Sequence, residues 1–177
     1  MAENENYEWH RAASIVRDAG GMIVGRTKLQ KIAYLLYLAG YDDGFRFSYH
    51  HYGPYSEDLS EAIRAAEIFD LVTEEERTAD WGGKYSIYTA IEAIGAEDKQ
   101  SPRGKLASKA VEMNSIELEL AATAAYLASE ENIDDPWQET EKRKPEKARD
   151  DHLENAKKAY QELCRINTEI PLPELSG

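Results

Sequence analysis

Cysteines, long apolar runs and catalytic motifs are scarce or absent in this sequence. Its single cysteine, Cys164, cannot form an intramolecular disulfide or a cysteine-based zinc cluster, and one thiol in 177 residues is typical of a reducing compartment. No apolar run reaches the roughly 18 residues that a membrane-spanning helix needs. The first residues, MAENENYEWH, are polar and acidic, unlike a secretory signal peptide. We therefore expect a cytoplasmic protein with no membrane segment.

Enzyme motifs are missing as well. The sequence contains no GxSxG, GxGxxG, Walker-type loop or HExxH, and the glycine pairs 20–21 and 82–83 are too short to cradle phosphates. His50 and His51 are adjacent in a predicted strand, so their side chains point to opposite faces and cannot easily chelate one ion. The paired carboxylates lie in helix caps or charge runs, where solvent keeps them ionised. We expect no enzymatic activity, no cofactor and no metal.

The net charge of −13 is spread over both halves of the chain. Phosphate contacts dominate nucleic-acid affinity and require clustered basic residues, so this charge disfavours nucleic acids and anionic membranes as partners. The one compact basic cluster in the N-terminal half is Arg26, Lys28 and Lys31. It is interpreted either as a solvated helix start or as a docking patch for an acidic partner.

Apolar periodicity predicts three helices and two β segments in the N-terminal half. The helices are expected at residues 5–19, 28–39 and 56–69, with Thr27 and Ser56 as N-caps of the last two. The middle helix is apolar nearly all round, which predicts burial at the centre of the domain. The β segments are a short strand at 45–51, which Gly53-Pro54 breaks, and a hairpin whose arms, 71–77 and 84–90, flank a Gly-rich turn carrying Trp81.

This order of elements is the one expected of a winged helix. We predict a mainly α protein with a small antiparallel β-hairpin or sheet (α+β), in which a winged-helix-like domain covers residues 1–96. Met22 to Gly25 is expected to be an apolar link. Residues 97–177 are predicted to form a C-terminal helical extension packed on that domain, because the apolar stripes of its helices need burial. The end of the chain, from Ile170, is expected to be extended, and the basic stretch 142–147 to be solvated.

The densest aromatic stretch lies between the second and third predicted helices. Its tyrosines either pack against the start of the third helix or form a rigid platform for a partner peptide, because tyrosine is enriched in binding hot spots. An extended segment ending in Gly-Pro also offers an edge for strand addition. The candidate partner-binding residues are therefore Tyr49, His50, His51, Tyr52, Gly53, Pro54 and Tyr55, together with Arg26, Lys28 and Lys31.

Two segments at this spacing carry a resemblance to a known family. The stretches Thr27-Lys-Leu-Gln-Lys-Ile-Ala-Tyr34 and Tyr49-His-His-Tyr-Gly-Pro-Tyr-Ser56 resemble the bacterial Panacea (SocA-like antitoxin) superfamily, and are closest to its YwgA-like branch. Lys144-Pro145 and the following helix also look like that branch. The resemblance implies a largely helical domain of winged-helix character. It also implies a role in toxin–antitoxin, phage or defence loci, as an antitoxin that binds a toxin directly or as an adaptor that delivers one to a protease.

Two function classes follow from these observations. The first is a non-enzymatic protein-binding module of antitoxin or proteolytic-adaptor type, with a homodimer as a further assembly to consider. The second is a winged-helix DNA-binding transcriptional regulator. The predicted topology and the hairpin residues Trp81 and Lys84 favour this class. The predicted outward face of the third helix carries four carboxylates and one arginine, which would repel a phosphate-lined groove. We therefore expect a protein partner.

Overall fold

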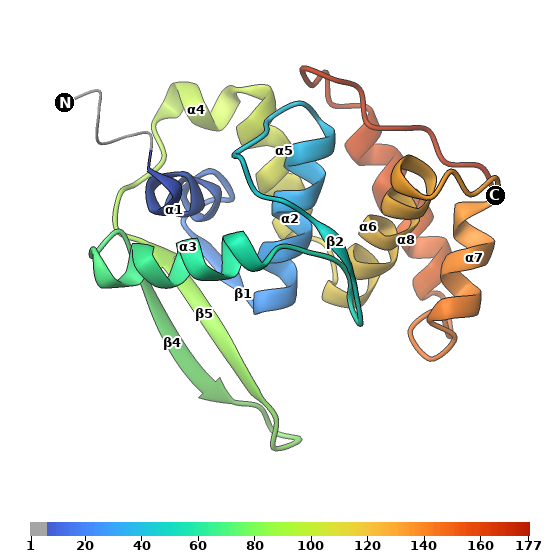
Figure 1. Ribbon diagram of the computed structural model, residues 1–177, viewed down its shortest axis with the longest axis horizontal. Helices are drawn as coiled ribbons and strands as arrows, with labels where there is room; N and C mark the ends of the chain where they lie inside the picture. Colours follow the sequence, from blue (N-terminus) through green and yellow to red (C-terminus); the bar gives the residue numbers. More distant parts are fainter. Residues whose placement is uncertain (1–6) are drawn as a thin grey trace.

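The computed structural model describes residues 7–177, which form eight helices and five strands (Figure 1). The strands make one three-stranded and one two-stranded antiparallel sheet, which confirms the mainly α, α+β class. No helix in this range combines the length and apolar composition needed to cross a lipid bilayer. The elements are α1 Glu8–Asp18, β1 Met22–Val24, α2 Arg26–Leu38, β2 Ser48–His50, β3 Gly53–Tyr55, α3 Glu57–Ile68, β4 Val72–Thr78, β5 Lys84–Ala90, α4 Ala96–Gln100, α5 Pro102–Val111, α6 Ser115–Glu130, α7 Pro136–Arg143 and α8 His152–Cys164.

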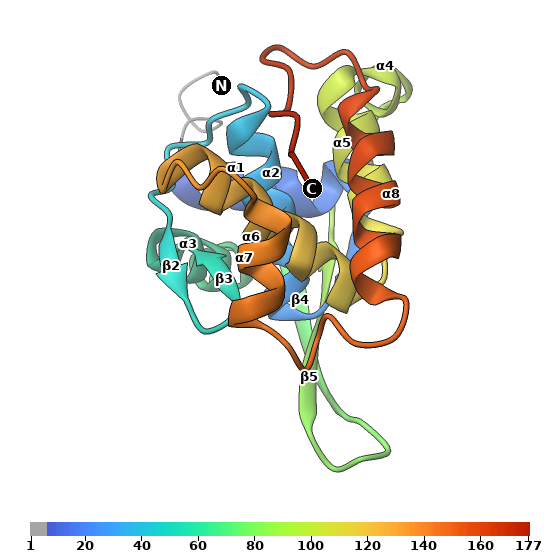
Figure 2. The ribbon, with the colours of Figure 1, turned by 90° about the vertical axis from the view of Figure 1, so that its right-hand side faces the viewer.

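Apart from the inserted pair β2–β3, the elements α1, β1, α2, α3, β4 and β5 follow one another in the order of a winged helix. β5 lies between β1 and β4 in the larger sheet. The predicted hairpin is confirmed, with arms only slightly displaced from the expected residues. In Figures 1 and 2, β4 and β5 extend away from the helical body, and we call these strands and their turn the wing.

The predicted apolar link at residues 22–25 is wrong, because three of its residues form β1. Ile23 is fully buried and pairs with Tyr88 of β5, while Met22 and Val24 on either side are exposed. A strand of three residues is too short to display an alternating pattern in the sequence. Its pairing with β5 depends on a hydrogen-bonding partner that is more than sixty positions away along the chain.

The central helix α2 is buried nearly all round, as its composition predicts, with Leu29 through Leu36 shielded from solvent. It packs against α1, α5 and α6. Its start differs from the prediction, since α2 begins at Arg26 and Gly25, not Thr27, is the N-cap residue. Gly25 has a φ of 103°, a backbone conformation that favours glycine, and no side chain caps the helix.

The start of α3 agrees with the prediction. Ser56 is fully buried, and its Oγ accepts a hydrogen bond of 3.1 Å from the backbone N–H of Leu59. This satisfies one of the N–H groups that a helix leaves unpaired in its first turn. Glu57 and Asp58 follow in that turn, where the helix dipole favours negative charge. Ser56 thereby fixes where the β2–β3 segment ends and α3 begins.

The C-terminal helices lie directly on the N-terminal elements. α5 and α6 contact α2, while α7 and α8 pack on α6, as Figure 2 shows from the side. Buried residues from both halves belong to one apolar cluster. From Ile170 the chain forms neither helix nor strand, and Leu172 in this tail is buried. The Tyr160 hydroxyl donates a 2.6 Å hydrogen bond to the carbonyl oxygen of Pro173, which holds the tail on α8.

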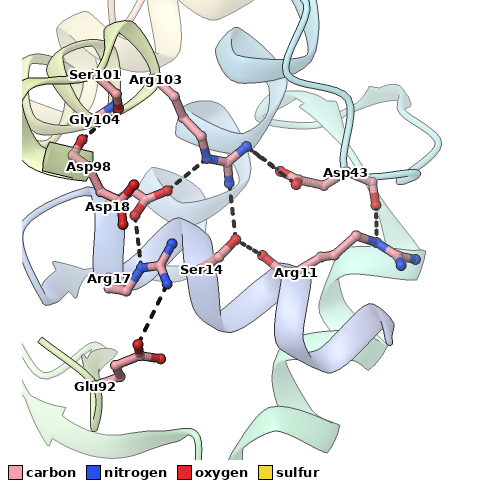
Figure 3. A network of polar contacts seen from close by, with 10 residues as sticks. All are labelled: Arg11, Ser14, Arg17, Asp18, Asp43, Glu92, Asp98, Ser101, Arg103 and Gly104. Carbon is pink, nitrogen blue, oxygen red and sulfur yellow. Dashed lines mark hydrogen bonds and ion pairs between the residues drawn. The ribbon is translucent and has the colours of Figure 1, made fainter. Parts of the chain in front are cut away.

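A polar network also joins the two halves (Figure 3). Arg103 of α5 donates to Asp18 of α1 at 2.7 Å, to Asp43 in the segment after α2 at 3.1 Å, and to Ser14 Oγ at 3.1 Å. Arg17 holds the other carboxylate oxygen of Asp18 at 3.0 Å. Burial raises the pKa of Asp43, and the nearby Arg103 charge opposes that rise. The network fixes the segment that leads into β2.

Candidate functional site

The aromatic segment forms a two-stranded hairpin. The strand expected over 45–51 is shorter, with β2 covering only Ser48–His50, and Gly53-Pro54 does not end the β structure but begins the returning strand β3. Tyr49 pairs with Pro54 across the hairpin. Gly53 makes the reversal after the turn possible because its φ is 90°, in the region that favours glycine. We call residues 48–55 the tyrosine hairpin.

Two side chains of α2 bind the backbone of β3 and of the residue that follows it. The Nζ of Lys31 donates a 2.7 Å hydrogen bond to the carbonyl oxygen of Pro54, and Lys31 itself is 1% exposed. Gln30 forms two bonds with the backbone of Ser56, accepting from its N–H at 2.8 Å and donating to its carbonyl at 2.9 Å. Two side chains of the central helix therefore bind the backbone at Pro54 in β3 and at Ser56 directly after it.

The turn of the hairpin is held from the C-terminal half. Lys144 is 7% exposed, and its Nζ donates to the carbonyl oxygen of His51 at 2.9 Å and to the carboxylate of Glu119 at 2.9 Å. Lys147 binds the second oxygen of Glu119. The prediction that the stretch 142–147 is solvated is therefore wrong for Lys144. Glu119, on α6, is the carboxylate among these lysines, and it is 3% exposed.

The basic residues expected as one exposed cluster are separated in the structure. Lys31 is buried under β3, and Lys28 donates its Nζ hydrogens to the carbonyl oxygens of Val111 and Met113 at 3.0 and 2.8 Å. Arg26 pairs with Glu74 of β4 at 3.1 Å. All three cations therefore bind partners outside α2, and they form no continuous basic surface.

The residues of the tyrosine hairpin fall into a packed and an exposed set. Tyr49 lies against Tyr126 with 5.7 Å between ring centroids, and the Arg143 guanidinium sits 5.1 Å from the Tyr49 ring centre. Gly53 and Pro54 are buried, and Tyr55 is half-buried with its ring 4.8 Å from that of His50. Exposed are Ser48, His50, His51 and Tyr52, the last at 56%. Packing therefore accounts for Tyr49, Gly53 and Pro54, and the platform interpretation stays a prediction for the exposed residues alone.

Tyr52 is exposed but held in place. The Nζ of Lys147 lies 4.5 Å from the centre of its ring, a cation–π contact. Lys147 is in turn bound by Glu119. Lys144 thus fixes the backbone next to Tyr52, and Lys147 restrains the Tyr52 ring. Such an arrangement suits binding, because little conformational entropy is lost when a partner binds.

The sequence pattern did not point to Glu119 or Lys144 as members of this site. The one clue is that Glu119 lies between Leu118 and Leu120 at the start of the alanine-rich part of α6, where a carboxylate is rarely buried unless it is paired. Among residues 7–177, no group of three histidine, cysteine, aspartate or glutamate side chains is placed to hold a metal ion.

A substitution at Gly53 tests the packing under the hairpin. Gly53→Ala is expected to lower the free energy of unfolding by about 1–2 kcal/mol, because a β-carbon disfavours this positive φ. The new β-carbon would also come against the Thr123 hydroxyl of α6. Urea denaturation of both proteins measures the loss. Gly82→Ala in the wing turn, which has a φ of 92° but open space around it, separates backbone strain from the contact.

The winged-helix surfaces are acidic in this protein. The solvent-exposed positions of α3 include Glu57, Glu61, Arg64 and Glu67, and β4 of the wing carries Glu74, Glu75 and Glu76 in succession. Trp81 at the end of the wing is 81% exposed.

Comparisons of the chain with known protein families and with curated proteins found no match.

Proposed function

We propose that this chain is a protein-binding module without chemistry of its own, and that it recognises its partner through the exposed set of the tyrosine hairpin. The observation that carries the proposal is Tyr52, which is 56% exposed at the turn of a hairpin whose backbone is bound by the buried amines of Lys31 and Lys144. An exposed tyrosine on a fixed backbone provides a large contact area at a small entropic cost.

The resemblance to SocA-like antitoxins supports a more specific role within this class. In this proposal the partner is a toxin, which the chain binds directly or delivers to a protease, and the complex forms in the cytoplasm. The net charge of −13 favours a partner with a basic surface, because opposite charges accelerate encounter.

The test begins with affinity purification of the full chain from its host and identification of the co-purified protein. The complex is then reconstituted from purified components and titrated calorimetrically. Tyr52→Ala is expected to weaken binding by about 2 kcal/mol, or more than tenfold, while the urea midpoint stays nearly unchanged. Trp81→Ala is the matched control, since it removes an exposed aromatic side chain from the wing. An affinity that Tyr52→Ala leaves intact would exclude the hairpin as the recognition element.

DNA binding is the second candidate, and the order of elements together with Trp81 and Lys84 in the wing favours it. The exposed carboxylates of α3 oppose it, because in a helix-turn-helix this helix enters the major groove. A gel-shift series across salt concentrations separates the two candidates. Phosphate contacts produce a steep loss of affinity with salt, and absence of a shift at low salt would exclude DNA.

A further inference from the structure

A pocket lined by aromatic rings and carboxylates lies between the end of α2, the segment before β2 and the end of α6. Its volume is about 320 Å³. Tyr37, Phe47 and Tyr126 contribute rings, and Asp42 and Glu130 contribute carboxylates. None of these five residues belongs to the tyrosine hairpin, although Tyr126 also packs against Tyr49 of that hairpin.

The aromatic lining is built around a buried tyrosine. The ring centroid of Tyr34 is 6.1 Å from Tyr37, 5.2 Å from Phe47 and 5.7 Å from Tyr126. Tyr34 is fully buried, and its hydroxyl has no hydrogen-bond partner within residues 7–177. Clustered rings of this kind attract cations, because the face of each ring carries negative electrostatic potential.

The carboxylates around the pocket also favour a cationic ligand. Within residues 7–177, neither Asp42 nor Glu130 is ion-paired, and Asp42 accepts only the backbone N–H of Gly44. Arg46 also lines the pocket, but its guanidinium is held by both carboxylate oxygens of Asp58, at 2.9 and 3.0 Å. The pocket therefore combines aromatic rings with two carboxylates that form no ion pair within residues 7–177.

We infer that this pocket binds an arginine side chain of the partner protein. A guanidinium is planar, stacks on aromatic faces and donates two parallel hydrogen bonds to a carboxylate, so it matches both components of the lining. A lysine ammonium is a compact, strongly hydrated charge and matches only one of them. The inference rests on the proposed function for the source of the arginine, but the chemistry of the pocket can be tested without the partner.

The probe is N-acetyl-arginine amide, titrated into the isotopically labelled full chain and followed by NMR. Saturable shifts are expected at the amides of Tyr37, Phe47 and Glu130. N-acetyl-citrulline amide has nearly the same shape without the charge, and it is expected to bind about tenfold more weakly, because its neutral N–H groups make weaker hydrogen bonds to a carboxylate. N-acetyl-lysine amide is expected to fall between the two.

Variants of the exposed carboxylates complete the test. Glu130→Gln and Asp42→Asn are each expected to weaken arginine binding about tenfold, whereas Glu61→Gln on α3 removes an exposed carboxylate elsewhere and leaves binding unchanged. Equal binding of citrulline or lysine, shifts that do not saturate, or affinities indifferent to both pocket variants would overturn the inference. If the pocket fails these tests while Tyr52→Ala still weakens the complex, the proposed function survives. If the pocket passes and no protein partner is recovered, the proposed function alone fails.

Discussion

Replacing Glu119 with glutamine is expected to lower the free energy of unfolding by about 3–5 kcal/mol. Glu119 is 3% exposed and binds both Lys144 and Lys147. Glutamine keeps the size of the side chain but removes its charge and turns an N–H₂ group toward one of the lysines. The amide oxygen can accept from only one of the two lysines, and Lys144 then remains buried without a counterion. A buried charge without its counterion costs far more than a surface pair contributes.

Urea denaturation at neutral pH measures the loss, and Glu117→Gln is the matched control. Glu117 lies two positions earlier on α6, and its bonds to His152 and Asn155 are partly solvent-exposed. That substitution is expected to cost less than about 1 kcal/mol. In a double-mutant cycle with Lys144→Met, the combined loss should be smaller than the sum of the single losses, because both remove one interaction. A loss no larger than that of Glu117→Gln would show that the lysine cluster does not depend on Glu119.

The fold is easier to predict from the sequence than the candidate site, because most of its elements are determined by residues close together in the chain. Helices α1, α2 and α3 follow from periodic apolar residues, and the cap at Ser56 depends on a backbone N–H only three positions away. The wing follows from alternating strands and a glycine-rich turn. Local chemistry decides each of these features. β1 is the exception, because its three residues acquire strand structure only through β5.

Lys28 and Lys31 show what local chemistry misses. Both belong to the segment Lys28-Leu-Gln-Lys31, which looks like the solvated start of a helix. Their hydrogen-bond acceptors are backbone carbonyls at Val111, Met113 and Pro54, and no side-chain pattern marks those carbonyls as acceptors. In the sequence, a buried lysine that binds a backbone carbonyl cannot be distinguished from a solvent-exposed lysine. The tyrosine hairpin was recognised by its composition, whereas the lysines that hold it were assigned to the surface.

Replacing Lys31 with methionine is expected to change how stability depends on pH. Burial lowers the pKa of Lys31 to about 7 from its ordinary value of 10.5, although the charge of Glu119 acts in the opposite direction. Between these two values the unfolded chain holds a proton that the folded chain has largely released. Stability conferred by a group with this difference increases with pH. From pH 7 to 9.5, the wild type should therefore gain on Lys31→Met by up to about 1.4 kcal/mol per pH unit.

Unfolding free energies of the two proteins, measured by urea denaturation from pH 6 to 9.5, give the difference directly. Below about pH 7 the curves should run parallel, because Lys31 is then charged in both states. The lost bond to the Pro54 carbonyl shifts the difference by a constant and leaves its slope unchanged. Lys105→Met, at an exposed position, controls for removal of a charge. In a Glu119→Gln background the rise should begin at lower pH, because the charge that holds up the pKa of Lys31 is gone. A difference that stays flat in both backgrounds would mean that Lys31 keeps its proton when buried, with the Pro54 carbonyl and Glu119 compensating the charge.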